Sequence, residues 1–573
     1  MCYILRGGRR TGGLQPMFRP STLDPRLPQR SSLGGFSLRV SLSLVAALTV
    51  AGCLSLEAQK AAADAEVYAL VADRRARLGS SAEPLVVEPP ADAMAVRLRA
   101  QLVSEGQTEL LVLDLVDCLR LASETNRAYQ AMRESLYLTA LDVTLERFLL
   151  GWRPFVDGGA TISGDLGDNP QTLTGDFTPG FTRILGSGAQ IVGNLGAGLF
   201  ENLLSSEGGG LTTNFALSVT QPLLQGAGSL VTIESLRQSE RNLVYSVRNF
   251  ERFRRTLAFD VAELYYRILQ VEENLANAQA NADSLRAVTA RNEALARAGR
   301  LRDIQVDQAR QDEFNAVSSV INARQSLQGQ VDNFALFLGL PVGTAIELDK
   351  SALDRLTATG LQEAELDEAG ALAVALERRL DLRTARDQLV DARRQVEIAA
   401  NGLQGFVGLT SNIGGVSDLA QPFDYTNDNI NWSLGLDFDL PVARLPQRNL
   451  WRAALIGVQA TARSTELLED QVRTQIRNAV RELNARRQDY QIQDDAVRLS
   501  ERRVESVQLF LEAGEAQTRD LLEAQEALVQ AQNARVEALV DYRLGLLALW
   551  RDTELLAVAD SGLSRLPEDT DRL

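Results

Sequence analysis

Proline is missing from two long stretches of the chain, between Pro222 and Pro341 and between Pro446 and Pro567. Because proline removes a backbone hydrogen-bond donor and breaks helices, only stretches without it can form very long helices. In the first stretch, apolar residues recur in steps of three and four: Val261, Leu264, Ile268, Val271, Leu275, Ala278, Ala282 and Leu285. This heptad pattern is typical of helices that pack nearly parallel over long distances. The sequence therefore predicts a mainly α-helical protein with unusually long helices.

Two glycines interrupt these helical patterns. The first long helix is expected from about Leu230 to Gly299, which is about 70 residues or roughly 105 Å at about 1.5 Å per residue. A helix of about 35 residues then returns toward Pro341. The second long helix is expected from about Asn449 to Gly514, and its partner from Arg519 to about Leu549. The segments "RAGRLRDIQVDQ" and "EAGEAQTRDLLEAQ" around the two glycines resemble each other. The pattern predicts two helical hairpins.

Shorter helical segments precede the strands of each half, and they suggest an internal repeat. "LDLVDCLRLASETNRAYQAMRESLYLTALDVTLERFLL" lies ahead of Pro154, and "LDEAGALAVALERRLDLRTARDQLVDARRQVEIAA" holds the equivalent place in the second half, with Leu372 and Ala375 matching Leu119 and Ala122. Stacked end to end, a short helix and the returning helix would match one long helix. A weak but ordered repeat of this kind is what an ancient duplication leaves. The expected divisions are an N-terminal extension (53–112), repeat 1 (113–341), a linker (342–365), repeat 2 (366–556) and a C-terminal tail (557–573).

Period-two alternation between the helices indicates strands. In "NWSLGLDFDLP", apolar side chains alternate with serine, glycine and aspartate, and "NFALSVTQP" repeats the pattern in the first half. The partner strands are expected in "PFVDGGATISGD" and "GLQGFVGLTSNIGG", which gives four strands per chain. The glycine-rich segment 166–210 is expected to be a long loop, with an extra surface hairpin.

The strand pattern fits a soluble sandwich or an outer-membrane barrel. Strands of about ten residues with one apolar and one polar face have the length and pattern of a membrane barrel. Four strands cannot close a barrel, and open sheet edges are not tolerated in lipid. In the membrane reading, several copies of the chain must therefore contribute strands to a shared barrel.

The N-terminus resembles a secretory signal. "RVSLSLVAALTVAGC" places an arginine before an apolar run from Val40 to Val50, and the run is too short to span a bilayer as a stable helix. The last four residues, Val50 to Cys53, look like a bacterial lipobox. Residues 1–52 are thus expected to be removed and Cys53 to carry lipid; the alternative is a plain signal peptide with an incidental cysteine.

Composition excludes several classes of function. There is no histidine, which removes the Ser-His-Asp triad and His-ligated zinc. The only lysines, Lys60 and Lys350, lack the context of a phosphate-binding loop. The three cysteines have no metal-ligand spacing, so neither a metal nor a cofactor is expected. A formal net charge of -16 makes a nucleic-acid partner unfavourable. No enzyme is predicted.

The order helix, strand, strand, long helix, Ala-Gly turn and helix, written twice behind a lipobox, resembles the outer membrane factors, the TolC family of efflux and secretion channels. The resemblance covers most of residues 113 to 556. It implies a homotrimer whose twelve strands form one β-barrel in the outer membrane of a Gram-negative-type cell, continued by a long α-helical tunnel in the periplasm. It also implies docking to a periplasmic adaptor (membrane fusion) protein coupled to an inner-membrane pump of the RND or ABC type.

The resemblance assigns roles to residues beside the two turns. In the family, carboxylates after the glycine turns ring the closed periplasmic aperture, and those positions fall on Asp520 and Glu523. Two residues are missing from the first turn, so Asp303 aligns less well. The alternative is that these acids belong to a solvated helix face. Gly299 and Gly514 are expected at the hairpin tips, either contacting the adaptor or acting as plain helix terminators.

The favoured function is a passive export duct of a tripartite efflux or type I secretion system. The alternative is a structural coiled-coil envelope lipoprotein. That alternative explains the heptads and the lipobox, but it leaves the strands and the duplicated hairpins unexplained.

Overall fold

The computed structural model describes the chain in ten segments, and residues 1–64 and 65–573 form two separate units. The description below concerns the second unit. The signal segment 1–52 and Cys53 lie outside the described residues, as do parts of the extension and of the C-terminal tail. The described residues are 55–77, 86–88, 94–105, 110–164, 172–202, 209–341, 343–362, 366–418, 421–559 and 562–566.

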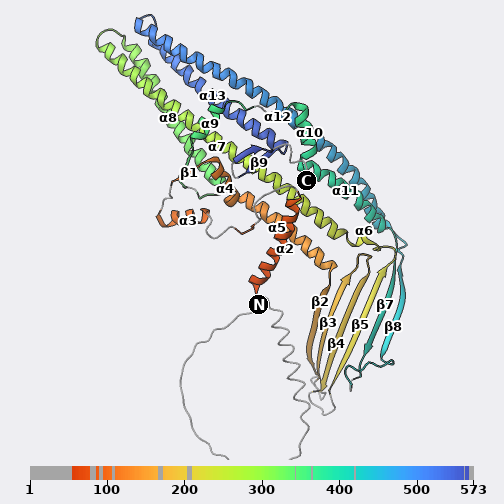
Figure 1. The fold of residues 1–573 in the computed structure, drawn as a ribbon. Helices are drawn as coiled ribbons and strands as arrows, with labels where there is room; N and C mark the ends of the chain where they lie inside the picture. The colour runs from red at the N-terminus through yellow and green to blue at the C-terminus, as the bar shows by residue number, and fades with distance from the viewer. Residues whose placement is uncertain are drawn as a thin grey trace, which may run out of the picture. The chain divides into compact units, whose positions relative to one another are not determined.

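Two long helical hairpins dominate the structure (Figure 1). The first consists of α7 (Glu234–Arg297) and α8 (Asp303–Phe337), and the second of α12 (Leu445–Ala513) and α13 (Thr518–Asp552). At 64 and 69 residues, α7 and α12 confirm the long helices predicted from the absence of proline. Among the described residues, no helix combines the length and apolarity needed to cross a membrane.

Each half also contains a shorter, broken helix. Asp114 and Asn126 cap α4 (Leu115–Thr125) and α5 (Arg127–Leu150) through their side chains. Asp367 caps α10 (Glu368–Arg378) in the same way, and α11 (Leu380–Asn401) follows. The single helix predicted in each half is thus divided after its first three turns. In the first half, Asn126 ends α4 and caps α5, whereas the second break falls at Arg379, whose side chain makes no capping hydrogen bond. The duplication itself stays a prediction.

The short and returning helices share the flank of a long helix. Helices α5 and α8 both pack along α7, while α11 and α13 both pack along α12. At the first joint, Asn126 Nδ2 donates to the Phe337 carbonyl at 2.6 Å, and the Thr125 hydroxyl donates to the Leu338 carbonyl. Helix α5 therefore starts where α8 ends, which agrees with the predicted end-to-end stacking. Each chain thus contributes four helical columns, meaning four helix-wide rows along the tunnel axis: α7, α12, the stacked pair α5 and α8, and the pair α11 and α13.

One antiparallel sheet lies at the end of this unit opposite the hairpin turns (Figure 1). Its strand order is β2-β3-β4-β5-β7-β8. The prediction of four strands was wrong: the sheet has six in the described part of the chain. Within 166–210, expected to be a long loop with an extra surface hairpin, residues 172–184 and 190–202 form a hairpin that lies inside the sheet, between β2 and β5. The strands are β2 (Arg153–Ser163), β3 (Thr172–Ile184), β4 (Gln190–Asn202), β5 (Gly210–Pro222), β7 (Phe406–Val416) and β8 (Ile430–Asp439).

Glycines obscured the two extra strands in the sequence. Gly180 in β3 pairs with Phe155, and Gly193 in β4 pairs with Phe181. A Cβ atom built on Gly193 would lie 2.6 Å from Phe181 Cζ, so the phenyl ring occupies the space of the missing side chain. Here glycine lets a neighbouring aromatic ring lie flat on the sheet, and it does not mark a loop.

Short elements tie the helices together around the middle of the unit. Strand β1 (Leu111–Leu113) pairs in parallel with β6 (Ile346–Leu348), and β9 (Leu556–Ala559) pairs with β10 (Gly562–Arg565). The predicted linker 342–365 thus contains β6 and α9 (Ser351–Thr359). The N-terminal extension includes α2 (Leu56–Ala76) and α3 (Met94–Glu105).

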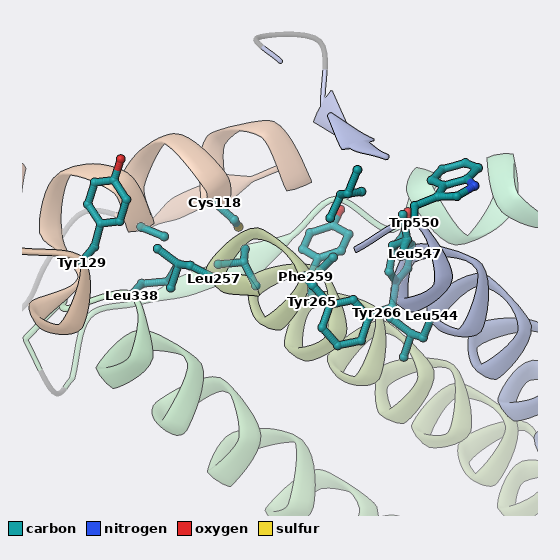
Figure 2. Packing of buried hydrophobic residues seen from close by; sticks show 14 of the residues in the cluster. Cys118, Tyr129, Leu257, Phe259, Tyr265, Tyr266, Leu338, Leu544, Leu547 and Trp550 are labelled. Atoms are coloured by element: carbon teal, nitrogen blue, oxygen red, sulfur yellow. The ribbon is translucent and has the colours of Figure 1, made fainter. Parts of the chain in front are cut away.

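A single large apolar cluster joins these elements (Figure 2). It gathers side chains from the short helices, α7, the end of α8 and the end of α13. Tyr265 is fully buried, and its hydroxyl donates to the Asp349 carbonyl at 3.1 Å. Arg75 of α2 forms a buried ion pair with Glu251 of α7 at 3.0 Å. The extension is therefore anchored to the long helix by a charge pair that its neighbours shield from water.

Candidate functional site

The second hairpin turns at Gly514, which has a left-handed backbone with φ of 79°. The next amide, of Glu515, donates to the Phe510 carbonyl at 2.8 Å and closes the end of α12. A Cβ at Gly514 would meet no atom within 4 Å, so the left-handed conformation, and not lack of space, favours glycine here.

Gly299 ends the first hairpin in the same way. Its φ is 71°, and the Arg300 amide donates to the Leu295 carbonyl at 2.9 Å. Both glycines therefore lie at the turns of the hairpins. The tips differ in charge, because Arg300 and Arg302 are exposed at the first turn and Glu515 is exposed at the second.

Asp520 and Glu523 lie on the exposed side of the first turns of α13. Asp520 has a local structural role that its spacing from the glycine did not reveal: its carboxylate accepts from the Gln517 amide at 2.8 Å in a capping box. Glu523 pairs with Arg519 at 2.8 Å, four residues apart on the helix. Since both partners are at least half exposed, this pair adds little stability.

Asp303 occupies a different position from Asp520. It is the first residue of α8, whereas Asp520 is the third of α13. An exposed carboxylate at a helix N-terminus interacts favourably with the helix dipole. The shift in the sequence alignment of the two turns thus corresponds to a different place in the helix.

Near the tips, α13 contacts the first hairpin through a small apolar cluster and a hydrogen bond. Gln525 Nε2 donates to Ser284 Oγ at 2.9 Å. Burial, and after it the negative charge of Glu526 in α13, raise the pKa of Asp312 in α8. The sequence carried no signal for Asp312, because its partner comes from the other hairpin. The apolar cluster consists of Ala282, Leu285, Ala316, Val320 and Leu522.

The sheet has two chemically different faces. Cross-strand pairing places Val156, Phe177, Leu195, Leu217, Ile413 and Leu434 on one face, one residue from each strand. The other face presents Asp157, Asp176, Asn194, Ser218, Asn412 and Asp437. On the apolar face of the isolated chain, Trp432 is 77% exposed and Phe438 is 72% exposed. Such a sheet can separate an apolar from an aqueous environment.

The two outer strands of the sheet each have one unpaired edge. In the described residues, β2 pairs only with β3, and β8 only with β7. Their backbone amides and carbonyls on the free side need partners wherever water is absent.

One family model matches part of this chain. Residues 191–340, from β4 to the end of α8, match the family described as "Outer membrane efflux protein". A search of the curated proteins found no match.

Solved structures share the fold. The chain is similar to the Campylobacter jejuni outer membrane channel CmeC, at 14% identity and a TM-score of 0.56, covering 80% of this chain and 88% of that one. The outer membrane protein VceC from Vibrio cholerae gives 16% identity and a TM-score of 0.56, covering 77% and 95%. The Neisseria gonorrhoeae channel MtrE gives 17% and 0.56, covering 77% and 88%.

Proposed function

We propose that this chain is an outer membrane factor, as its sequence resemblance indicated, and that it forms a passive export duct of a tripartite efflux or type I secretion system. The observation that carries the proposal is a sheet with one polar face, one apolar face and two free edges. This sheet is joined to two helical hairpins, and the long helix of each hairpin has more than 60 residues. The sheet supplies a wall through the outer membrane, and the hairpins supply a tunnel in the periplasm.

The free edges require further copies of the chain. In lipid, each unpaired backbone group costs several kcal/mol, which disfavours an open sheet. Three copies, the number that the family implies, place β8 of each copy against β2 of the next and close the wall. The apolar face then contacts lipid and the polar face lines the lumen.

The hairpin tips form the periplasmic entrance. Around a threefold axis, Asp520 and Glu523 contribute six carboxylates to a narrow aperture, and Asp303 adds three more from the neighbouring tips. Like charges close together repel and favour passage of cations. Gly299 and Gly514 lie where a periplasmic adaptor protein would contact the duct, and an RND or ABC pump of the inner membrane would supply the energy through that adaptor.

Cys53 is proposed to anchor the mature chain. Cleavage before this residue would leave an acylated N-terminus in the outer membrane, ahead of α2. Mass spectrometry of the purified protein tests this: an N-terminal peptide that starts at an unmodified residue other than Cys53 would refute it.

Single-channel conductance of the mature protein in a planar bilayer tests the duct. The charge-removing variant is Asp520→Asn/Glu523→Gln, in which the asparagine can keep the capping interaction with Gln517. We expect a small, cation-selective conductance that rises in this variant. No conductance from either protein, despite a folded oligomer, would favour a structural envelope lipoprotein.

A matched control separates the aperture from a general effect of charge. Glu466 and Glu482 are exposed carboxylates of α12 far from its tip. Glu466→Gln/Glu482→Gln removes the same charge and should leave the closed-state conductance unchanged. An equal rise in this control would show that the tip carboxylates do not form the barrier.

A further inference from the structure

The hairpin β3–β4 lies inside the sheet, between β2 and β5. Its two strands add to the circumference of the proposed duct and so increase its width. We propose that the wall of the trimer contains eighteen strands, six from each copy, and that the hairpin widens the lumen at membrane level until it matches the helical tunnel. This inference rests on the proposed function, because it assumes a closed wall of three copies. It would give the duct an outer section wide enough that selection of cargo occurs only at the hairpin tips.

Strand pairing shows that the hairpin is part of the wall and is not a flap. Strand β3 pairs with β2 from Arg153 to Ser163, the whole length of β2. Strand β4 pairs with β5 over eleven consecutive residues, from Gln190 to Phe200. Since β3 is the only partner of β2 in the described sheet, moving the hairpin out of the wall would detach β2 as well.

The hairpin also continues the division between the two faces. Phe177 and Leu195 lie on the apolar face, level with the apolar side chains of β5. Asp176 and Asn194 lie on the polar face. A hairpin that was folded over the lumen would have water on both sides and would have no need of an apolar face.

Aromatic rings over glycines fix the register of the inserted strands. Phe155 of β2 covers Gly180 of β3, and Phe181 of β3 covers Gly193 of β4. The same arrangement joins the two halves of the sheet, where a Cβ on Gly415 would lie 2.7 Å from the ring of Phe215. The joints of the inserted hairpin are therefore built like the joint between β5 and β7.

The number of strands is compatible with closure. Strand β2 runs away from the helices, following α5, and β8 runs back toward them, ahead of α12 (Figure 1). Because the six strands alternate in direction, β8 of one copy is antiparallel to β2 of the next. Adding a hairpin keeps the number even, so the insertion preserves antiparallel pairing all round the wall.

The widths can be compared by simple geometry. With strands about 4.8 Å apart and tilted by about 40°, a closed wall of twelve strands has a backbone diameter of about 24 Å, and one of eighteen strands about 36 Å. Three copies with four helical columns each make a ring of twelve helices. With helix axes about 9.5 Å apart, that ring has a diameter of about 37 Å. Eighteen strands therefore continue the tunnel without a step, whereas twelve would narrow it by about a third.

Spin labels on adjacent residues of β3 test the proposal. In the assembled full-length protein in lipid vesicles, a nitroxide on Phe177→Cys should collide often with oxygen, which concentrates in hydrocarbon, and rarely with a water-soluble nickel chelate. A label on Asp176→Cys should show the opposite preference. Cys118 is fully buried, so the labelling reagent should not reach it. Equal access of the chelate to both labels would overturn the proposal.

A control pair on β5 separates this inference from the function beneath it. Leu217→Cys and Ser218→Cys lie on the apolar and polar faces of a strand that was already predicted from the sequence. If the label on Leu217→Cys shows no contact with lipid, the proposed membrane duct fails. If that label contacts lipid but the label on Phe177→Cys does not, only the proposal of a widened wall fails. Electron cryomicroscopy of the purified trimer gives the count directly: eighteen strands support the inference, and twelve refute it.

Discussion

Gly339 lies at the joint between α8 and α5, and replacing it by alanine should loosen that joint. Its φ is 82°, and a Cβ atom would overlap the Thr125 carbonyl oxygen. The left-handed conformation costs an alanine about 1–2 kcal/mol. Moving Thr125 away would also disrupt the hydrogen bonds of Thr125 and Asn126 to the end of α8, at about 1 kcal/mol each. The expected loss is about 3–4 kcal/mol.

Gly299→Ala provides the matched control. It has nearly the same backbone conformation, with φ of 71°, but no atom lies within 4 Å of its Cβ position. This variant should lose only the conformational part, about 1–2 kcal/mol. Hydrogen exchange in α4, α5 and the end of α8 measures the first loss, and exchange at the α7–α8 tip measures the second. Equal losses in the two variants would refute the argument that close contact with Thr125 makes Gly339 essential.

Three further results are expected. The Cys118 thiol should resist alkylation at neutral pH in the folded protein, because burial and two nearby aspartates raise its pKa; mass spectrometry after treatment with iodoacetamide checks this. Arg75→Met should expose α2 to proteolysis in limited digestion, because the buried Glu251 loses its 3.0 Å partner and keeps only Arg254 at 3.6 Å, at a cost of about 1–3 kcal/mol. Burial and the charge of Glu526 raise the pKa of Asp312, so Asp312 binds a proton more readily in the folded protein than in the unfolded chain. Lowering the pH from above this raised pKa to the ordinary value of 3.8 should therefore stabilise the folded state, and Asp312→Asn should abolish this pH dependence of hydrogen exchange around Gln525.

The long helices could be predicted because their signal is local and cumulative. Proline is absent, apolar residues recur at helical spacing, and a glycine marks each reversal. The breaks at Asn126 and Arg379 were missed, because a single capping residue has little weight in a pattern that continues on both sides. Those breaks became visible only once the helices stacked on α8 and α13.

The inserted strands show what local patterns leave out. In isolation, Gly180 and Gly193 weaken the alternation of β3 and β4, and they favour a loop. Their meaning depends on Phe155 and Phe181, which belong to other positions of the sheet and cover them only after pairing. The influence of Glu526 on Asp312 was missed for a related reason, since the two residues belong to hairpins that are far apart in sequence.

Asp520 illustrates how the structure changes the design of an experiment. The sequence comparison assigned this residue to the aperture, but its carboxylate also caps α13 through the Gln517 amide. Truncation to alanine would remove the charge and a cap that contributes about 1 kcal/mol, so a more open entrance could result from a frayed helix. Asparagine removes the charge and retains an oxygen that can accept the same hydrogen bond. If Asp520→Asn opens the duct as fully as Asp520→Ala does, repulsion among carboxylates controls the entrance. If only the alanine variant opens it, the order of the helix end controls it.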